Sequence, residues 1–166
     1  MSELGTVLLE KLAPRHEVGL SDLFCALRAN GDGNFFYPHP LTSEEARKLC
    51  RCSGLDQYFV ATVNGRILGY GMLRGWDEGY AIPSLGLATH PDARSQGLSE
   101  FLMRGLIQEA RNRGAPQLRL TADASRLRLI NFLYAMVLFS AHSNRAGCWV
   151  FSIFRGPNDG CRLGQS

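Results

Sequence analysis

Residues 84–114, SLGLATHPDARSQGLSEFLMRGLIQEARNRG, form the stretch that decides the fold. The apolar run from Leu85 to Thr89 predicts a strand, and the turn His90-Pro91-Asp92 ends it. A helix is predicted next, because apolar residues recur at three- and four-residue spacings until Gly114 stops them. This apolar stripe consists of Leu98, Phe101, Leu102, Leu106, Ile107 and Ala110. The stretch therefore predicts a strand, a turn and a helix in succession.

The loop from Arg94 to Ser99 leads into this helix and indicates its chemistry. The first turn of a helix has amide N–H groups without intrahelical partners at the positive end of the helix dipole, so a phosphate is stabilised there. Gly97 removes a Cβ where such a ligand would approach. The loop has neither the Lys-Ser or Lys-Thr of a P-loop nor the three glycines of a dinucleotide fingerprint. It is therefore a third kind of phosphate loop.

The whole chain of 166 residues is expected to form one domain over residues 1–155, followed by a flexible tail over residues 156–166. Apolar residues make up 45% of the chain, and none of its apolar runs is long enough to cross a bilayer. The net charge of +3 comes from scattered arginines, which argues against nucleic acid as a partner. No membrane partner is expected either.

The N-terminus and the cysteines indicate the compartment. The first residues lack the basic region of a signal peptide, so a cytoplasmic protein is expected. The five cysteines match no zinc or thioredoxin-like spacing, which predicts reduced thiols and no metal.

The remaining elements follow from periodicity, capping and turn signals. Asn64-Gly65 is a strong hairpin turn, and Thr42 with Glu45 has the spacing of a capping box. Strands are predicted at Thr6–Leu12, Gln57–Val63, Arg66–Leu73, Tyr80–Thr89, Pro116–Ala122 and Gly147–Arg155, and helices at Glu17–Arg28, Thr42–Cys50 and Ser125–Val137. Because one helix links the two central strands, these strands must be parallel in an otherwise antiparallel sheet. The fold class is therefore α/β with a mixed sheet.

The segment Arg94-Ser95-Gln96-Gly97-Leu98-Ser99 resembles the R/Q-x-x-G-x-G/A pyrophosphate loop of the GNAT superfamily of acyl-CoA-dependent N-acetyltransferases, with Ser99 in place of the last Gly or Ala. The preceding Thr89-His90-Pro91-Asp92-Ala93-Arg94 reproduces the apolar-x-Pro-Asp-x-Arg run of that superfamily. Phe132-Leu133-Tyr134 with Leu138-Phe139 is similar to its L-Y-x-K-x-G-F segment. The resemblance covers roughly Gln57 to Phe154.

This resemblance implies a GNAT-like fold, in which a mostly antiparallel sheet contains one splayed parallel strand pair and is flanked by helices. Unpaired backbone groups in the splay would hold the pantetheine arm of acetyl-CoA, which serves as co-substrate. The Leu87 amide would hold the acetyl carbonyl, and the amides from Ser95 to Ser99 the pyrophosphate. The full set of implied cofactor residues is Leu87, Ala88, Thr89, Arg94, Ser95, Gln96, Gly97, Leu98, Ser99 and Asn131.

The resemblance also places Tyr134 beside the departing thiolate, as its proton donor. Leu127 and Leu138 stand where the superfamily usually has an asparagine and a glycine. The general base is open: Pro83 and Leu85 occupy the strand positions where a carboxylate is often found. Candidates from the adjacent loops are Glu78, which we take as the catalytic one, together with Asp77, His39 and a chain of waters.

Two aromatic loops outside the cofactor loop are expected to bind the acceptor, through Phe35, Phe36, Tyr37, His39, Trp76 and Asp77. None of the five cysteines lies in the candidate site segments, which favours direct attack in a ternary complex over a covalent enzyme intermediate. The expected activity is acetyl transfer from acetyl-CoA to a primary amine of a small molecule, amino sugars included. One alternative is acetyl transfer to a protein or peptide amine, and another is a non-catalytic acyl-CoA sensor. Whether the protein forms a homodimer is left open.

Overall fold

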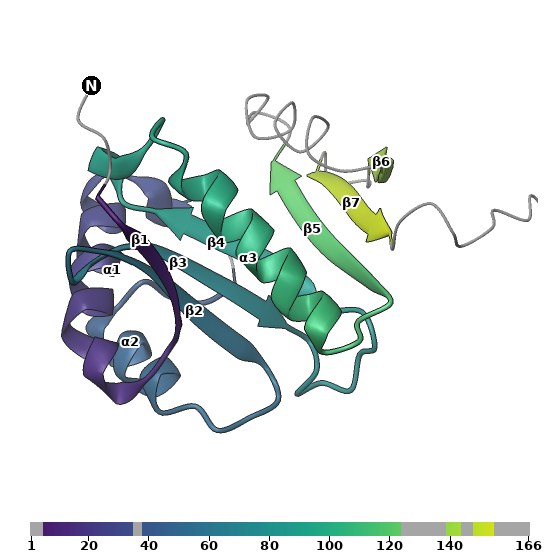
Figure 1. Cartoon of the computed structure of the whole chain (residues 1–166), viewed down its shortest axis with the longest axis horizontal. Coiled ribbons are helices and arrows are strands. Elements are labelled where there is room, and N and C mark those ends of the chain that lie inside the picture. Colours follow the sequence, from purple (N-terminus) through teal and green to yellow (C-terminus); the bar gives the residue numbers. More distant parts are fainter. Residues whose placement is uncertain (1–4, 35–37, 124–138, 144–147, 155–166) are drawn as a thin grey trace, which may run out of the picture.

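The structure, a computed structural model, describes residues 5–34, 38–123, 139–143 and 148–154. A mixed sheet of seven strands forms its centre, with the strand order β1-β2-β3-β4-β5-β7-β6. The helices α1 and α2 lie on one face of the sheet and α3 crosses the other (Figure 1). The elements are β1 (Val7–Lys11), α1 (Glu17–Ala29), α2 (Ser43–Cys50), β2 (Gln57–Val63), β3 (Arg66–Arg74), β4 (Ser84–Thr89), α3 (Leu98–Asn112), β5 (Gln117–Asp123), β6 (Phe139–Ser143) and β7 (Cys148–Phe154), with 3-10 turns η1 (Pro14–His16), η2 (Asp32–Asn34) and η3 (Pro91–Ala93).

Local sequence signals account for most of these boundaries. Asn64 and Gly65 have φ values of 51° and 78°, which form the tight turn between β2 and β3. The amide of Glu45 donates to the Thr42 hydroxyl at 3.1 Å, so Thr42 caps α2 as its spacing predicts. Gly114 follows α3 with a φ of 80° and ends it in the left-handed conformation.

One strand is shorter than its sequence predicts. β4 begins at Ser84, whereas the prediction started it at Tyr80. Residues 75–80 instead close a turn, in which the Tyr80 amide donates to the Gly75 carbonyl at 2.9 Å. Pro83 then stands directly before the strand and has no N–H to contribute to a sheet. The turn and the proline together delay the start of pairing.

The two central strands are parallel, as predicted, and they separate after a short paired start. β4 and β5 pair only at Ser84 with Arg119 and at Leu85 with Leu120, although both strands continue in the described residues. Figure 1 shows β5 diverging from β4 beside α3. The sequence prediction of a helix at Ser125–Val137 lies outside the described residues.

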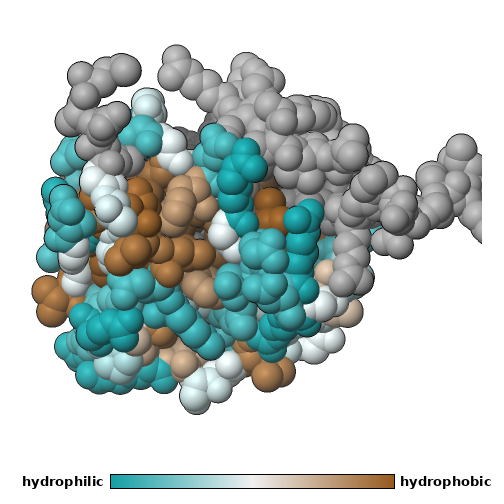
Figure 2. All heavy atoms as spheres, viewed as in Figure 1, coloured by the Kyte–Doolittle hydropathy of each residue, from teal (hydrophilic) through white to brown (hydrophobic). Residues whose placement is uncertain are grey.

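The core has a part on each face of the sheet. Leu20, Phe24 and Leu27 of α1 pack with Tyr70 and other side chains of β2 and β3 on one face. On the other face the apolar stripe of α3 packs against β2 to β5, with Leu102, Met103 and Leu106 fully buried. The outward side of α3 is largely hydrophilic (Figure 2). The sheet therefore separates two sets of side chains. Candidate site residues can act together only if they lie on the same face. Within the described residues, no helix has the length and apolar character that a membrane crossing requires.

Candidate functional site

The splay leaves one edge of β4 open. The Arg119 amide donates to the Pro83 carbonyl at 2.9 Å, so the backbone of Pro83 faces β5, whereas the His90 amide faces β3 and donates to Leu68 at 2.8 Å. Backbone groups of successive strand residues point to opposite sides. Those of Leu87 and Thr89 therefore face β5 in the unpaired part of β4. We call this side of β4, from residue 86 to residue 89, the open edge.

The start of α3 lies directly after the open edge in the chain. Gly97 is the N-cap with a φ of 81°, and no side chain caps this helix. Ser95, with a φ of 63°, is one of two non-glycine residues with positive φ among the described residues. The first intrahelical bond runs from the Phe101 amide to the Gly97 carbonyl. The amides of residues 95–100 have no protein acceptor within the described part of the chain, so they are available to an anion.

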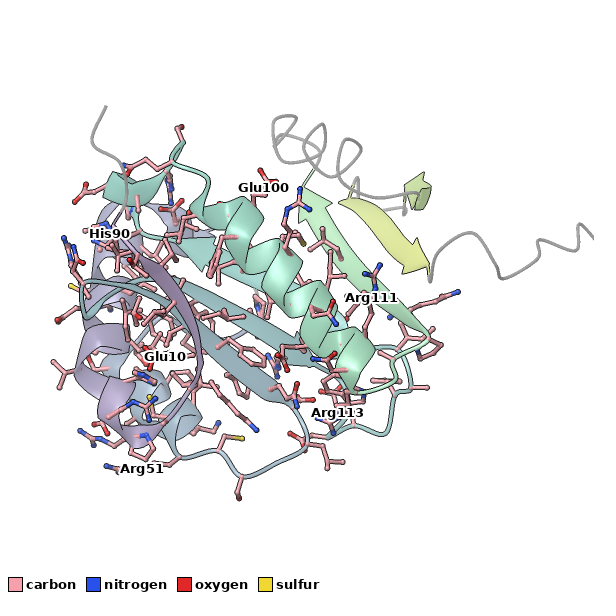
Figure 3. All side chains as sticks on the ribbon, viewed as in Figure 1. Glu10, Arg51, His90, Glu100, Arg111 and Arg113 are labelled. Carbon is pink, nitrogen blue, oxygen red and sulfur yellow. The ribbon has the colours of Figure 1, made fainter. Side chains whose placement is uncertain are left out.

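The turn between the open edge and α3 is held by its own polar groups. The Asp92 amide donates to Nδ1 of His90 at 3.2 Å, so the His90 ring helps to fix the turn. The Gln96 amide group donates to the Asp92 carbonyl at 2.9 Å and closes the loop from the other side. Figure 3 places His90 at this end of the molecule and Arg113 at the opposite end of α3.

Arg94 connects this loop to the segment that follows α1. Its guanidinium donates to Asp32 at 2.7 Å, and Asn30 donates to the same carboxylate oxygen at 2.9 Å. The Asp32 side chain is only 15% exposed, so this ion pair is partly desolvated. Asp32 belongs to η2, directly before residues 35–37, so Arg94 links the loop before α3 to the segment after α1.

His39 is held on the α1/α2 face of the sheet. Its Nδ1 lies 2.9 Å from the Pro40 carbonyl, which can only accept, so Nδ1 carries the proton. Nε2 is therefore the acceptor for the Tyr70 hydroxyl at 3.0 Å. Burial lowers the pKa of His39, which keeps the ring neutral near pH 7. The ring also packs beside Phe24 and Tyr70, with centroid distances of 5.6 Å to each.

Around this histidine the same face carries further aromatic and charged groups. Tyr58 stacks on Tyr70 with ring centroids 6.4 Å apart and planes 8° apart. Burial raises the pKa of Tyr58 to about 12, so its phenol stays protonated. Arg74, at the end of β3, donates to the Pro38 carbonyl at 2.7 Å. Residues 38–40 are thus fixed over the side chains of Tyr70 and Arg74.

Trp76, by contrast, lies on the α3 face. It packs against the core beneath α3, and the guanidinium of Arg113 lies 4.0 Å from its ring centroid. The sheet therefore separates Trp76 from His39, although the sequence analysis assigned both to one acceptor site. Asp77 accepts from the amides of Leu55 at 2.6 Å and Asp56 at 3.3 Å, so its carboxylate supports the fold locally.

Glu78 lies in the same turn and is exposed, with no side-chain hydrogen bond in the described part of the chain. The structure places it in the turn before β4 begins, away in sequence from Leu87 of the open edge. Tyr134, Asn131 and residues 35–37 lie outside the described residues.

Asp56 is a structural residue that the sequence analysis missed. Its Oδ1 accepts from the amides of Gly75, Trp76 and Asp77 at 2.8, 2.9 and 3.2 Å, and its side chain is 5% exposed. Asp56 and Asp77 therefore each cap the backbone of the other's segment. The turn-forming Ser-Gly-Leu-Asp sequence before β2 indicates a capping carboxylate. Its partners lie about twenty residues further along the chain, so a local sequence pattern does not predict them.

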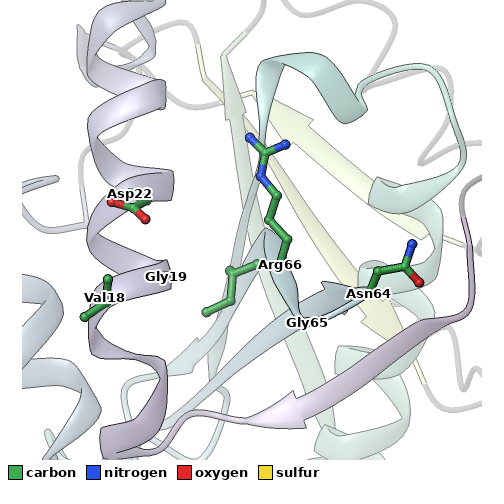
Figure 4. Close-up of a pocket in the computed structure, with 7 residues that line it drawn as sticks. Val18, Gly19, Asp22, Asn64, Gly65 and Arg66 are labelled. Carbon is green, nitrogen blue, oxygen red and sulfur yellow. The ribbon is translucent and has the colours of Figure 1, made fainter.

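A pocket of about 330 Å³ lies between α1 and the β2–β3 hairpin (Figure 4). Val18, Asp22, Asn64 and Arg66 are among its lining residues, and none of the predicted site residues is. Arg66 extends from it toward His90, with a nitrogen–nitrogen distance of 3.4 Å. No cluster of three or more metal-ligating side chains occurs among the residues that the structure describes.

The open edge and the start of α3 together suit an extended ligand that carries amides and ends in an anion. Leu87 and Thr89 offer strand-like hydrogen bonds to an extended chain, because their backbone groups face the splay. The amides of residues 95–100 offer several donors to a phosphate, without the need for a basic side chain. The α1/α2 face beside the open edge carries the partly exposed Arg74 above the buried core that contains Tyr58 and Tyr70.

Comparison with known proteins gives the same architecture. The model of the family described as "Acetyltransferase (GNAT) family" matches residues 26–136. The chain is similar to the PaiA N-acetyltransferase of Thermoplasma acidophilum in complex with coenzyme A, with 11% identity, a TM-score of 0.73 and coverage of 90% of this chain and 99% of that chain. It is likewise similar to the GNAT domain of PAT from S. lividans, with 13% identity, a TM-score of 0.74 and coverage of 91% of this chain and 92% of that chain.

The chain is also similar to the ribosomal-protein-S18-alanine N-acetyltransferase of Escherichia coli, with 16% identity, a TM-score of 0.67 and coverage of 93% of this chain and 98% of that chain. At these identities the structural likeness concerns the fold. No curated protein matches the sequence.

Proposed function

Because the chain belongs to the acetyltransferase (GNAT) family, we propose that it transfers an acetyl group from acetyl-CoA to a primary amine of a small molecule. The observation that carries the proposal is the open edge of β4, which leads directly to a helix start with unpaired amides. Leu87, Ala88 and Thr89 would contact the pantetheine arm, and the amides from Ser95 to Ser99 the pyrophosphate. Arg94, held by Asp32, would fix the shape of the loop.

The proposed reaction is a direct attack within a ternary complex. The nitrogen lone pair of the amine forms a bond to the thioester carbon, and the carbon–sulfur bond breaks as the carbonyl is restored. The backbone N–H of Leu87 would stabilise the negative charge that develops on the carbonyl oxygen. The amine loses a proton to a base, and the departing thiolate gains one from Tyr134.

The base is proposed to be Glu78, acting directly or through water. Of the three side-chain candidates, Asp77 is engaged by two backbone amides, and both ring nitrogens of His39 already have hydrogen-bond partners. Glu78 alone has a carboxylate without a partner in the described residues. Because Glu78 lies in the exposed turn before β4, we propose that a chain of water molecules carries the proton from the amine at the open edge to its carboxylate.

The cysteines support direct attack over a covalent enzyme intermediate. Burial raises the pKa of Cys50 to about 11, so its thiol is protonated at neutral pH and is a poor nucleophile. Cys25 and Cys52 are exposed on the α1 and α2 side of the molecule. The unpaired thiols of these three residues also support a proposed cytoplasmic setting.

The test is coenzyme A release from acetyl-CoA over a panel of small amines, amino sugars and short peptides. We expect turnover with at least one small amine at a kcat within the usual range of roughly 1–10³ s⁻¹. If only the peptides were acetylated, the acceptor would be a protein amine and not a small molecule. Tight acetyl-CoA binding without turnover of any amine would identify an acyl-CoA sensor instead of an enzyme.

A further inference from the structure

The α1/α2 face beside the open edge carries one arginine whose hydrogen-bonding capacity is largely unused. We infer that the acceptor is a small amine that also bears a carboxylate, and that Arg74 binds this carboxylate. The inference rests on the proposed function, because it names a feature of the acceptor for the same site. Its basis is the position of Arg74 on β3, the N–H donors of its guanidinium that have no partner among the described residues, and its partial exposure.

Arg74 is placed to reach an acceptor at the open edge. It is the last residue of β3 and pairs with Ser84, while Gly71 pairs with Leu87, so the two positions are three residues apart along β4. At about 3.4 Å per residue this separation is roughly 10 Å along the strand. The side chain lies on the face of Tyr70, as its contact with Pro38 requires. A long arginine side chain and a short acceptor can together span that distance.

The guanidinium has donors that the protein does not satisfy. Its Nε is buried and has no hydrogen-bond partner among the described residues. The nearest carboxylate oxygen, Oδ2 of Asp56, is 3.8 Å from Nε, too far for a hydrogen bond. Among the described residues, Arg74 makes one hydrogen bond, to the Pro38 carbonyl. Since a guanidinium has five N–H donors arranged to fit a carboxylate, most of this capacity is unused.

The surroundings favour an anionic ligand over further protein contacts. The Arg74 side chain is 32% exposed, so a ligand can reach it, and it lies on the same side of the sheet as the buried rings of Tyr58 and Tyr70. A charge-assisted pair is stronger in such a partly desolvated setting than in open solvent. Asp56 pairs with Arg74 at 3.8 Å without a hydrogen bond to its Nε, while the other oxygen of Asp56 accepts three backbone amides, so the guanidinium keeps donors for a ligand. The site therefore fits the carboxylate of a small acceptor.

The test compares matched acceptors with wild-type enzyme. Straight-chain amino acids from glycine to 6-aminohexanoate are each assayed against their primary amides, which keep the amine and the chain but lose the negative charge. We expect the carboxylate to raise kcat/KM by about 10–100-fold at one or two chain lengths, mainly through KM. Turnover of both members of every pair at equal kcat/KM would overturn the inference and leave the proposed function intact.

Two variants assign the effect to Arg74. Arg74→Gln keeps a donor for the Pro38 carbonyl but removes the charge, so the ratio between acid and amide should fall toward one. Arg74→Lys retains the charge without the planar fork and should keep part of the ratio. Arg104→Gln is the matched control, because it removes one positive charge from the exposed side of α3. A preference that survives Arg74→Gln at full strength would contradict the assignment, and absence of turnover with every amine would contradict the proposed function itself.

Discussion

Asp56 shows how a single buried carboxylate can hold two loops in place. It accepts three backbone amides from the β3–β4 turn, while Asp77 in that turn accepts the amides of residues 55 and 56. Asp56 thus satisfies buried and part-buried donors, whereas the donors that Asp77 satisfies are more exposed. Arg113 adds a third contact, since it stacks on Trp76 and donates to the Leu55 carbonyl. The turn that carries Glu78 is therefore anchored on both sides.

Replacing Asp56 should destabilise the protein in proportion to the acceptors removed. Asp56→Ala leaves three amides without a partner, so we expect the free energy of unfolding to fall by at least about 2 kcal/mol. For a chain of this size that corresponds to a melting temperature lower by about 4–8 °C. Asp56→Asn keeps one acceptor oxygen and should lose less. Asp22→Ala, which removes an exposed carboxylate from α1, is the control. Equal melting temperatures for Asp56→Ala and this control would refute the capping role.

The start of α3 is built differently from the start of α2. Thr42 caps α2 with its own hydroxyl, and two glutamates occupy the first turn of that helix. The cap of α3 is Gly97, which has no side chain, and its neighbours at residues 94–97 are all exposed. A helix start without its own cap leaves its amides and its dipole to an external anion. This difference between two helices of one chain supports the proposed pyrophosphate site.

Gly97 and Gly114 allow this element to be tested with a matched pair. Both glycines have a φ near 80°, one before α3 and one after it, and an added Cβ would meet no atom within 4 Å at either position. Strain from a larger residue should therefore be similar at both ends. We expect Gly97→Glu to abolish measurable acetyl-CoA binding and Gly97→Asn to weaken it, because the side chain enters the phosphate space.

Gly114→Glu and Gly114→Asn should bind acetyl-CoA as wild type does. A thermal shift assay provides the measurement, since a ligand at about 100 times its dissociation constant stabilises the fold by roughly 2.7 kcal/mol. If a folded Gly97→Glu protein binds acetyl-CoA as tightly as the wild type does, the pyrophosphate does not bind at this loop.

At the scale of the whole molecule, the sequence predicts where helices and strands occur better than it predicts the face of the sheet on which a side chain lies. Periodicity, the Asn64-Gly65 turn and the Thr42 cap specify most helices and strands, because these signals act within a few residues. Whether a loop side chain lies above or below the sheet depends on strand register, which no local pattern contains. Trp76 and His39 were therefore assigned to one site but lie on opposite faces. The unused donors of Arg74 were equally invisible, since they result from packing between distant segments.

The stability of the whole fold should depend on pH through the buried His16 and the half-buried His39. Burial lowers the pKa of both His16 and His39 below 6.5, so the unfolded chain takes up protons that the folded chain resists. The free energy of unfolding should be constant between about pH 7 and 8 and should fall as the pH drops below ~6.5, by at most about 1.4 kcal/mol per pH unit for each histidine.

The measurement is chemical denaturation at several pH values above about 5, where carboxylates with a lowered pKa such as Glu10 remain charged. His39→Gln keeps an acceptor for the Tyr70 hydroxyl but cannot be protonated, so it should remove part of the slope, and a double variant with His16→Gln should remove most of it. The two single changes should add, because Glu10 and Arg15 surround one ring whereas Glu45, Lys48 and Arg74 surround the other. An unchanged slope in the double variant would place the acid sensitivity elsewhere in the fold.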